Sequence, residues 1–248
     1  MENIGLLIIT FFLSLGVHVW STVVGGGGPV LISALLFLGF SPQMAIATNR
    51  FGALSSFAAL WQFHRDGQVQ WKLGLFLAVF AGLGSALGSM LLLEVESDVV
   101  ERGIGVIILL SLPMLFLKPK AGIKSRKVQL TKVKQIGGGS MMFLLGILGG
   151  FFSATGTWFS YIYIFYYGMT FLETAATKKI AGICMLSFSL VVLIPAGIIN
   201  WPVAISMFAG GSIGSWLGAL YANKLGNEWI RYMFLVVMFV MAIKILLF

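Results

Sequence analysis

The sequence predicts an all-α polytopic membrane protein that contains two homologous repeats. Three observations indicate it: a very apolar composition, apolar runs long enough to cross a membrane, and an internal duplication. Of the 248 residues, 59% are hydrophobic and only 10% are charged, whereas about 25% of an ordinary soluble domain is charged. Several apolar runs reach the roughly 20 residues that a helix needs to span the hydrocarbon core. No polar stretch is long enough to form a separate soluble domain.

The duplication is visible as short motifs that recur in the same order at a nearly constant spacing. Internal repeats of this kind are common in secondary transporters. We therefore divide the chain into a first transmembrane repeat (1–117), a basic linker (118–137) and a second transmembrane repeat (138–248). The matching stretches are ATNR (47–50) with ATKK (176–179), GQVQW (67–71) with GIINW (197–201), and GLGSALGS (82–89) with SIGSWLGA (212–219).

In the first repeat, the stretch VVGGGGP (23–29) interrupts a continuous apolar run. Each glycine costs about 0.8–1 kcal/mol inside a helix, and proline is tolerated in the first turn of a new helix. The run after the break is too short to cross the membrane alone. We therefore expect a re-entrant hairpin, in which a helix breaks within the membrane and a half-helix returns. The expected spans are 4–24, 29–40, 43–63, 71–93 and 101–117.

In the second repeat, the stretch SATGTW (153–158) stands at the place of the glycine break and again begins with small residues. We expect a second hairpin there, followed by three crossing helices. Rows of glycine and serine within 82–89 and 210–218 predict close packing between helices, and we assign them no chemistry. The expected spans are 140–153, 157–168, 173–195, 201–222 and 229–248.

The positive charges predict an orientation. Seven of the 16 basic residues lie within 118–134, and short basic loops stay on the cytoplasmic side. No aromatic residue in this stretch could stack on a base, so we expect no nucleic-acid partner. With a hairpin and three crossing helices in each half, the second repeat is inverted relative to the first. Parallel repeats, which follow if each hairpin is one continuous crossing helix, are the alternative.

The predicted binding site lies at the glycine break. The N-terminus of the half-helix carries free N–H groups and the positive pole of the helix dipole, which attract an anion. Arg50 lies deep in an apolar span, where a charged side chain is costly and usually marks a substrate path. Of the adjacent pair Lys178 and Lys179, we expect one to face elsewhere. The predicted substrate-binding residues are Gly25, Gly26, Gly27, Gly28, Thr48, Asn49, Arg50, Thr155, Gly156, Thr157, Thr177, Lys178 and Lys179.

Several of these assignments have structural alternatives. Arg50 could extend to the lipid headgroups from a helix end, and Thr48 and Thr177 could be packing hydroxyls. His18 lies on the first helix before the break. It is either a proton carrier or a hydrogen-bonded packing residue.

The residues missing from the spans are also informative. Within the expected spans of the second repeat the only carboxylate is Glu173, at a helix start, whereas cation transporters usually carry acidic residues inside the membrane. The spans contain no nucleophile–base pair, and the single cysteine, Cys184, permits no disulfide within the chain. We therefore expect no enzyme, no catalytic residue, no metal and no cofactor. The expected partners are a small anionic substrate and the lipid bilayer, with a homodimer left open.

The quoted motifs resemble the sulfite exporter TauE/SafE family, in the branch described only as membrane transporters. The resemblance rests on 25–56, 64–71 and 82–89 and on their echo in the second half. It implies a secondary transporter of the inner membrane that moves a small sulfur-containing oxyanion, sulfite or an organosulfonate, often outward. Binding between the two hairpin tips, with one repeat rocking against the other, would give alternating access. An anion channel is the alternative.

Overall fold

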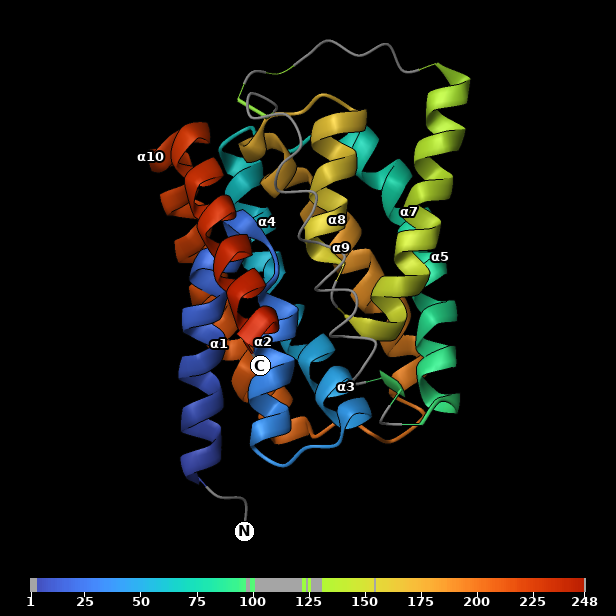
Figure 1. Ribbon diagram of the computed structural model, residues 1–248, viewed down its shortest axis with the longest axis vertical. Coiled ribbons are helices and arrows are strands. Elements are labelled where there is room, and N and C mark those ends of the chain that lie inside the picture. Colours follow the sequence, from blue (N-terminus) through green and yellow to red (C-terminus); the bar gives the residue numbers. More distant parts are fainter. Residues whose placement is uncertain are drawn as a thin grey trace.

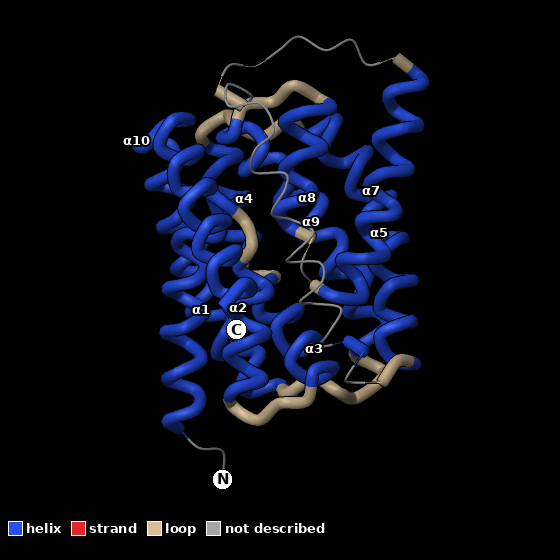
Figure 2. The backbone as a smooth tube through the Cα atoms, in the orientation of Figure 1, coloured by secondary structure: helices blue, strands red, loops and turns tan. Residues whose placement is uncertain are grey.

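The computed structural model describes residues 4–96, 99–100, 122–123, 125, 131–153 and 155–247, without the side chains of 24, 157, 231 and 233–247. The expected span 101–117 and most of the basic linker lie outside the described residues. The described part is helix and connecting loop with no strand (Figure 2). Five of its helices are long and apolar enough to cross a membrane. The prediction of an all-α polytopic membrane protein is confirmed.

The break expected in the first repeat is present. Gly25 and Gly26 have φ angles of 92° and 78°, which glycine adopts at little cost because it lacks a Cβ atom. Pro29 lies in the first turn of the next helix. In Figure 1, α1 rises from the N-terminal end of the molecule and α2 returns toward that end. The helices of this half are α1 (Ile4–Val24), α2 (Gly27–Phe37), α3 (Pro42–Ala53), α4 (Ser56–Arg65) and α5 (Trp71–Glu94).

The expected span 43–63 consists of two helices rather than one, because a turn at Leu54 and Ser55 separates α3 from α4. The N–H of Ser55 donates to the carbonyl of Gly52 at 3.2 Å, three residues back. The hydroxyl of Ser215 donates to the carbonyl of Ser55 at 2.8 Å. The Ser55 carbonyl is thus occupied by a side chain of α10, and a tighter turn forms where an α-helix would otherwise continue.

The second half also contains a broken hairpin. Between α7 and α8, Ser153 adopts a left-handed conformation with a φ angle of 57°. The two expected spans after residue 200 form α10, which is divided at Gly226 by a non-helical φ of 72° and ψ of 173°. The helices are α7 (Lys132–Phe152), α8 (Gly156–Tyr161), the π-helix η2 (Ile162–Tyr166), α9 (Phe171–Leu193) and α10 (Trp201–Leu247).

Glycine rows hold the two halves together. A Cβ atom at Gly84 or Gly88 of α5 would collide with backbone carbonyls of α7. A Cβ atom at Gly210, Gly214 or Gly218 of α10 would likewise collide with carbonyls of α1. The prediction of close helix packing at these rows is confirmed. The first helix of each hairpin therefore packs against a helix from the other half of the sequence.

Two hydrogen bonds occur in the same form in both halves. The Thr48 hydroxyl accepts from the backbone N–H of Asn200, and the Thr177 hydroxyl accepts from that of Gln70, each at 3.1 Å. In Figure 1, the α1–α2 hairpin opens toward one end of the molecule and the α7–α8 hairpin toward the other. The inverted relation of whole repeats stays a prediction, since 101–117 lies outside the described residues.

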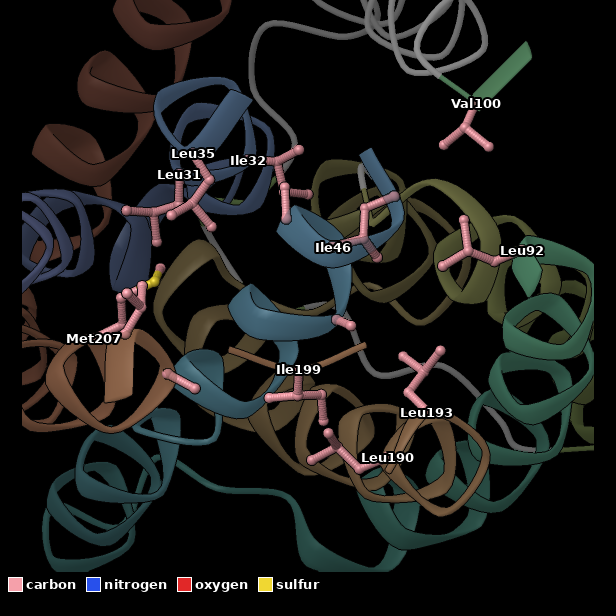
Figure 3. Packing of buried hydrophobic residues seen from close by; sticks show 14 of the residues in the cluster. Leu31, Ile32, Leu35, Ile46, Leu92, Val100, Leu190, Leu193, Ile199 and Met207 are labelled. Carbon is pink, nitrogen blue, oxygen red and sulfur yellow. The ribbon is translucent and has the colours of Figure 1, made fainter. Parts of the chain in front are cut away.

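A buried apolar cluster fixes the position of the half-helix α2. Leu31, Ile32 and Leu35 of α2 are each no more than 3% exposed. They share a cluster with Ile46 of α3 and Met207 of α10 (Figure 3). Burying a large aliphatic side chain is worth about 1.5–3 kcal/mol, although part of this driving force is absent where lipid replaces water. The cluster holds the N-terminus of α2 at the middle of the helix bundle.

Candidate functional site

A cavity of about 180 Å³ lies at the break between α1 and α2. Its walls come from both halves of the sequence: α1, the glycine break and α3 on one side, and α8 and α9 on the other. The cavity lies where the sequence predicts a binding site, and binding of a substrate there stays a prediction. Of the predicted binding residues, those that line the cavity are Gly25, Gly26, Gly27, Gly28, Asn49, Gly156, Lys178 and Lys179.

The glycines of the break are needed for space as well as for conformation. A Cβ atom at Gly25 would lie 3.0 Å from Nζ of Lys178, and one at Gly28 would lie 2.8 Å from the Ser153 carbonyl oxygen. The first N–H groups of α2 have no partner within their own helix. The absence of side chains therefore brings this helix N-terminus and the second hairpin close together.

Both lysines of α9 line the cavity. The expectation that one of the pair faces elsewhere is therefore wrong. Lys178 Nζ donates to the Ser160 hydroxyl at 2.8 Å, which orients the ammonium group beside the break. Adjacent residues on a helix point about 100° apart, but both side chains are long enough to reach one cavity.

Arg50 lies outside the cavity lining and is 1% exposed. Its Nη2 atom donates to the carbonyls of Gly149 at 2.8 Å and Gly150 at 2.5 Å, near the C-terminal end of α7. A cation at this end of a helix is favoured by the helix dipole. Its Nε atom has no hydrogen-bond partner within the described part of the chain. Direct contact between Arg50 and an anion stays a prediction.

The three predicted threonines whose side chains are described, Thr48, Thr155 and Thr177, are not part of the lining. Thr48 and Thr177 are fully buried, and each hydroxyl accepts the backbone bond described above. Thr155 is 3% exposed and lies directly before α8. The side chain of Thr157 lies outside the described residues. These positions favour packing and backbone roles for the threonines that are described.

The structure adds residues that the sequence did not single out. These residues are Ser21 of α1, Ser56 of α4 and Phe159 of α8, which line the cavity. His18, which the sequence did single out, lines it too. His18, Ser21 and Gly25 are three and four residues apart, so they share one face of the helix that enters the break. This spacing was a usable signal for Ser21. Ser56 carried no comparable signal, because the interruption of its helix was not predicted.

The cavity is suited chemically to a small anion. Among its described lining residues, none is acidic, and two carry an ammonium group. Within the same described set, no three His, Cys, Asp or Glu side chains are grouped so that they could hold a metal ion. The ammonium groups, the backbone N–H groups, the Asn49 amide and the hydroxyls can each donate a hydrogen bond to oxygen, whereas the amide oxygen and the His18 ring also offer acceptors.

The fold and this cavity define the class of a multi-pass membrane transporter. The profile of the family Sulfite exporter TauE/SafE matches residues 10–245. The chain belongs to this family, and the resemblance read from the motifs is confirmed. No solved structure matches the chain.

Relatives cover nearly the whole chain. A probable membrane transporter protein of Haemophilus influenzae is 31% identical over 245 residues, which are 98% of this chain and 95% of the relative. The probable membrane transporter protein YfcA of Escherichia coli K12 is 26% identical, over 97% of this chain and 90% of its own length. YdhB of Bacillus subtilis, described in the same words, is 24% identical over 88% and 90%. The family is described as a sulfite exporter and these relatives as probable membrane transporters, and neither description is that of an enzyme.

Proposed function

We propose that the protein is a secondary transporter of the inner membrane that carries a small sulfur-containing oxyanion, sulfite or an organosulfonate. The observation that carries this proposal is the cavity in which the N-terminus of α2 faces Lys178 and Lys179. Family membership supports the substrate class. The cavity lies between two broken hairpins. Transporters built from two repeats with broken helices hold their substrates at such a place.

Charge and dehydration together determine which solutes the cavity can bind. An oxyanion that enters a poorly hydrated cavity loses water and needs replacement donors. Backbone N–H groups at the start of α2 and the two ammonium groups supply them. A membrane potential that is negative inside drives one negative charge outward by about 2.3 kcal/mol per 100 mV. Export therefore needs no coupled ion, and we propose outward transport.

Anion binding to the purified protein tests the site. We expect the wild type to bind at least one of sulfite, thiosulfate, sulfoacetate and taurine more tightly than sulfate. Lys178→Gln and Lys179→Gln should each weaken that binding by about 10-fold to 100-fold, because each removes a charge-assisted hydrogen bond. Lys72→Gln is the matched control, since Lys72 lies on α5 and does not line the cavity.

The design separates the proposal from its competitors. Unchanged binding in a monodisperse Lys178→Gln, Lys179→Gln double variant would refute the site. Counterflow in proteoliposomes distinguishes a transporter from an anion channel: a transporter exchanges labelled anion against a gradient of unlabelled anion, whereas a channel only dissipates the gradient. Outward flux that depends on the imposed potential tests the direction.

A further inference from the structure

The hydrogen bonds of His18 fix which of its ring nitrogens carries a proton. Nδ1 lies 2.8 Å from the carbonyl oxygen of Ser14 and 3.2 Å from the Ser14 hydroxyl oxygen. The carbonyl can only accept. The hydroxyl uses its proton to donate to the carbonyl of Met207 at 2.6 Å, so it too acts as an acceptor toward the ring. Nδ1 must therefore be the donor.

The other ring nitrogen faces a different environment. With the proton on Nδ1, the neutral ring has a lone pair on Nε2. Nε2 makes no hydrogen bond within the described part of the chain and is not among its buried unpaired atoms, while His18 lines the cavity. His18 thus presents to the cavity an acceptor of fixed orientation, in addition to the Asn49 amide oxygen, which also has no partner among the described residues.

The charged groups that share the cavity with His18 are Lys178 and Lys179, both from α9. Among the described residues, α2 and the break supply glycines and Leu31, and α10 supplies the Met207 carbonyl behind Ser14. Two ammonium groups alone would favour the anion with the greater negative charge. An acceptor beside them disfavours the more highly charged anion. Its lone pair repels a substrate oxygen that carries no proton and attracts one that does.

We infer that His18 selects an oxyanion that carries its own hydrogen-bond donor, so that the transported form of a sulfite-type substrate is the singly charged hydrogensulfite ion. The inference rests on the proposed function and specifies the protonation state of its substrate. The O–H of the ion donates to Nε2 while its remaining oxygens accept from the lysines and the N–H groups of α2. A site built around a substrate O–H rejects analogues without it, because its own polar group is then left unpaired.

The test compares two anions of equal charge and similar size. Hydrogensulfite has an O–H where methanesulfinate has a methyl group. At a mildly acidic pH, where hydrogensulfite predominates over the sulfite dianion, we expect the purified wild type to bind hydrogensulfite about threefold to tenfold more tightly. Equal affinities for the two anions would overturn the inference and leave the proposed function standing. Failure to bind either anion would instead count against the proposed function.

Two substitutions at His18 give opposite expectations. His18→Asn places an amide N–H near the position of Nδ1, so it keeps the bond to Ser14 and loses Nε2. His18→Gln places its amide near the position of Nε2 and loses the Ser14 bond. We expect the preference for hydrogensulfite to disappear in His18→Asn and to persist in His18→Gln. If His18 only packs against Ser14, the preference for hydrogensulfite should instead persist in His18→Asn and disappear in His18→Gln. That result would overturn the inference.

A third measurement needs no variant at His18 and so cannot be confounded by misfolding. The chain contains two histidines, and His64→Gln assigns the imidazole signals of a ¹⁵N-histidine-labelled sample. The expected spectrum shows a proton on Nδ1 of His18, with the Nε2 signal shifting when hydrogensulfite is added but not when methanesulfinate is. A proton on Nε2 in the unliganded protein would contradict the inference.

Discussion

Arg50 illustrates how a buried cation can be stabilised by a helix end from the distant part of the chain. Its partners, Gly149 and Gly150, are 99 and 100 positions away. The sequence identified Arg50 as unusual, because an arginine in an apolar span is costly. It could not identify those partners, because they are backbone carbonyls that carry no sequence signal. The lysines of α9 and the glycine break were predictable for the opposite reason: residue type and position alone mark them.

We predict that Arg50 contributes to stability through its bonds to Gly149 and Gly150, in addition to any contact with the anion. Arg50→Ala leaves the carbonyls of Gly149 and Gly150 without this donor and should lower the free energy of unfolding by about 1–3 kcal/mol. Arg50→Lys keeps a charge but loses the planar fork, and we expect an intermediate effect. Thermal unfolding in detergent measures both. Unchanged stability together with lost anion affinity would instead identify Arg50 as a direct ligand.

At Gly25, both the backbone conformation and the lack of room for a Cβ atom predict that a side chain is destabilising. Its φ of 92° lies where a side chain is strained, at about 1–2 kcal/mol for a left-handed residue, and the added Cβ would crowd Lys178. Gly25→Ala should therefore lower both thermal stability and anion affinity. Gly16→Ala is the control, since a Cβ atom there meets nothing within 4 Å. Equal melting temperatures for the two variants would show that the break tolerates side chains.

At the scale of elements, local sequence predicted the helices better than their interruptions. The break at 25–28 was predictable because consecutive glycines disfavour a helix. The interruption between α3 and α4 was not, because FGALSS (51–56) contains only one glycine and reads as a continuous apolar run. Its structural partner, Ser215, lies 160 positions away. Interruptions that depend on a partner from elsewhere in the chain need the tertiary structure.

The packing of α1 on α10 should depend on single glycines. A Cβ atom at Gly214 would collide with the carbonyl of Leu15, which is backbone and cannot rotate away. Gly214→Ala should separate the helices and cost about 1–3 kcal/mol, as overpacking generally does. Ser212→Ala is the comparison, because the Ser212 hydroxyl donates to Phe208 of its own helix. A Gly214→Ala protein as stable as Ser212→Ala would show that α1 and α10 are free to move apart.

At the scale of the whole molecule, the packing changes how alternating access is expected to work. The sequence suggested that one repeat rocks against the other. The structure instead packs α1 closely on α10 and α7 closely on α5, so each close contact joins the two repeats. The duplication was visible in the sequence, but this exchange of partners was not, because matching motifs do not say which helices touch. We therefore expect α1 to move together with α10, and α7 together with α5, so that each moving unit contains helices from both repeats.

A disulfide between α1 and α10 distinguishes the two descriptions. The hydroxyl oxygens of Thr10 and Ser206 are 3.4 Å apart, which makes this pair the candidate for a cross-link between the two helices. In a Cys184→Ser background, the Thr10→Cys, Ser206→Cys protein should retain anion flux after oxidation, because these helices stay together. Flux that stops on oxidation and returns on reduction would support rocking of the sequence repeats. The reduced double variant is the internal control.

The contact between α1 and α10 also has a consequence for biogenesis. α1 leaves the ribosome well before α10, in which the glycine row that covers the carbonyl face of α1 begins at Gly210. α1 must therefore remain in the membrane without this neighbour until α10 has been synthesised. A nascent chain released before that row exposes this face of α1, which makes it a substrate for membrane quality control rather than a stable half-protein.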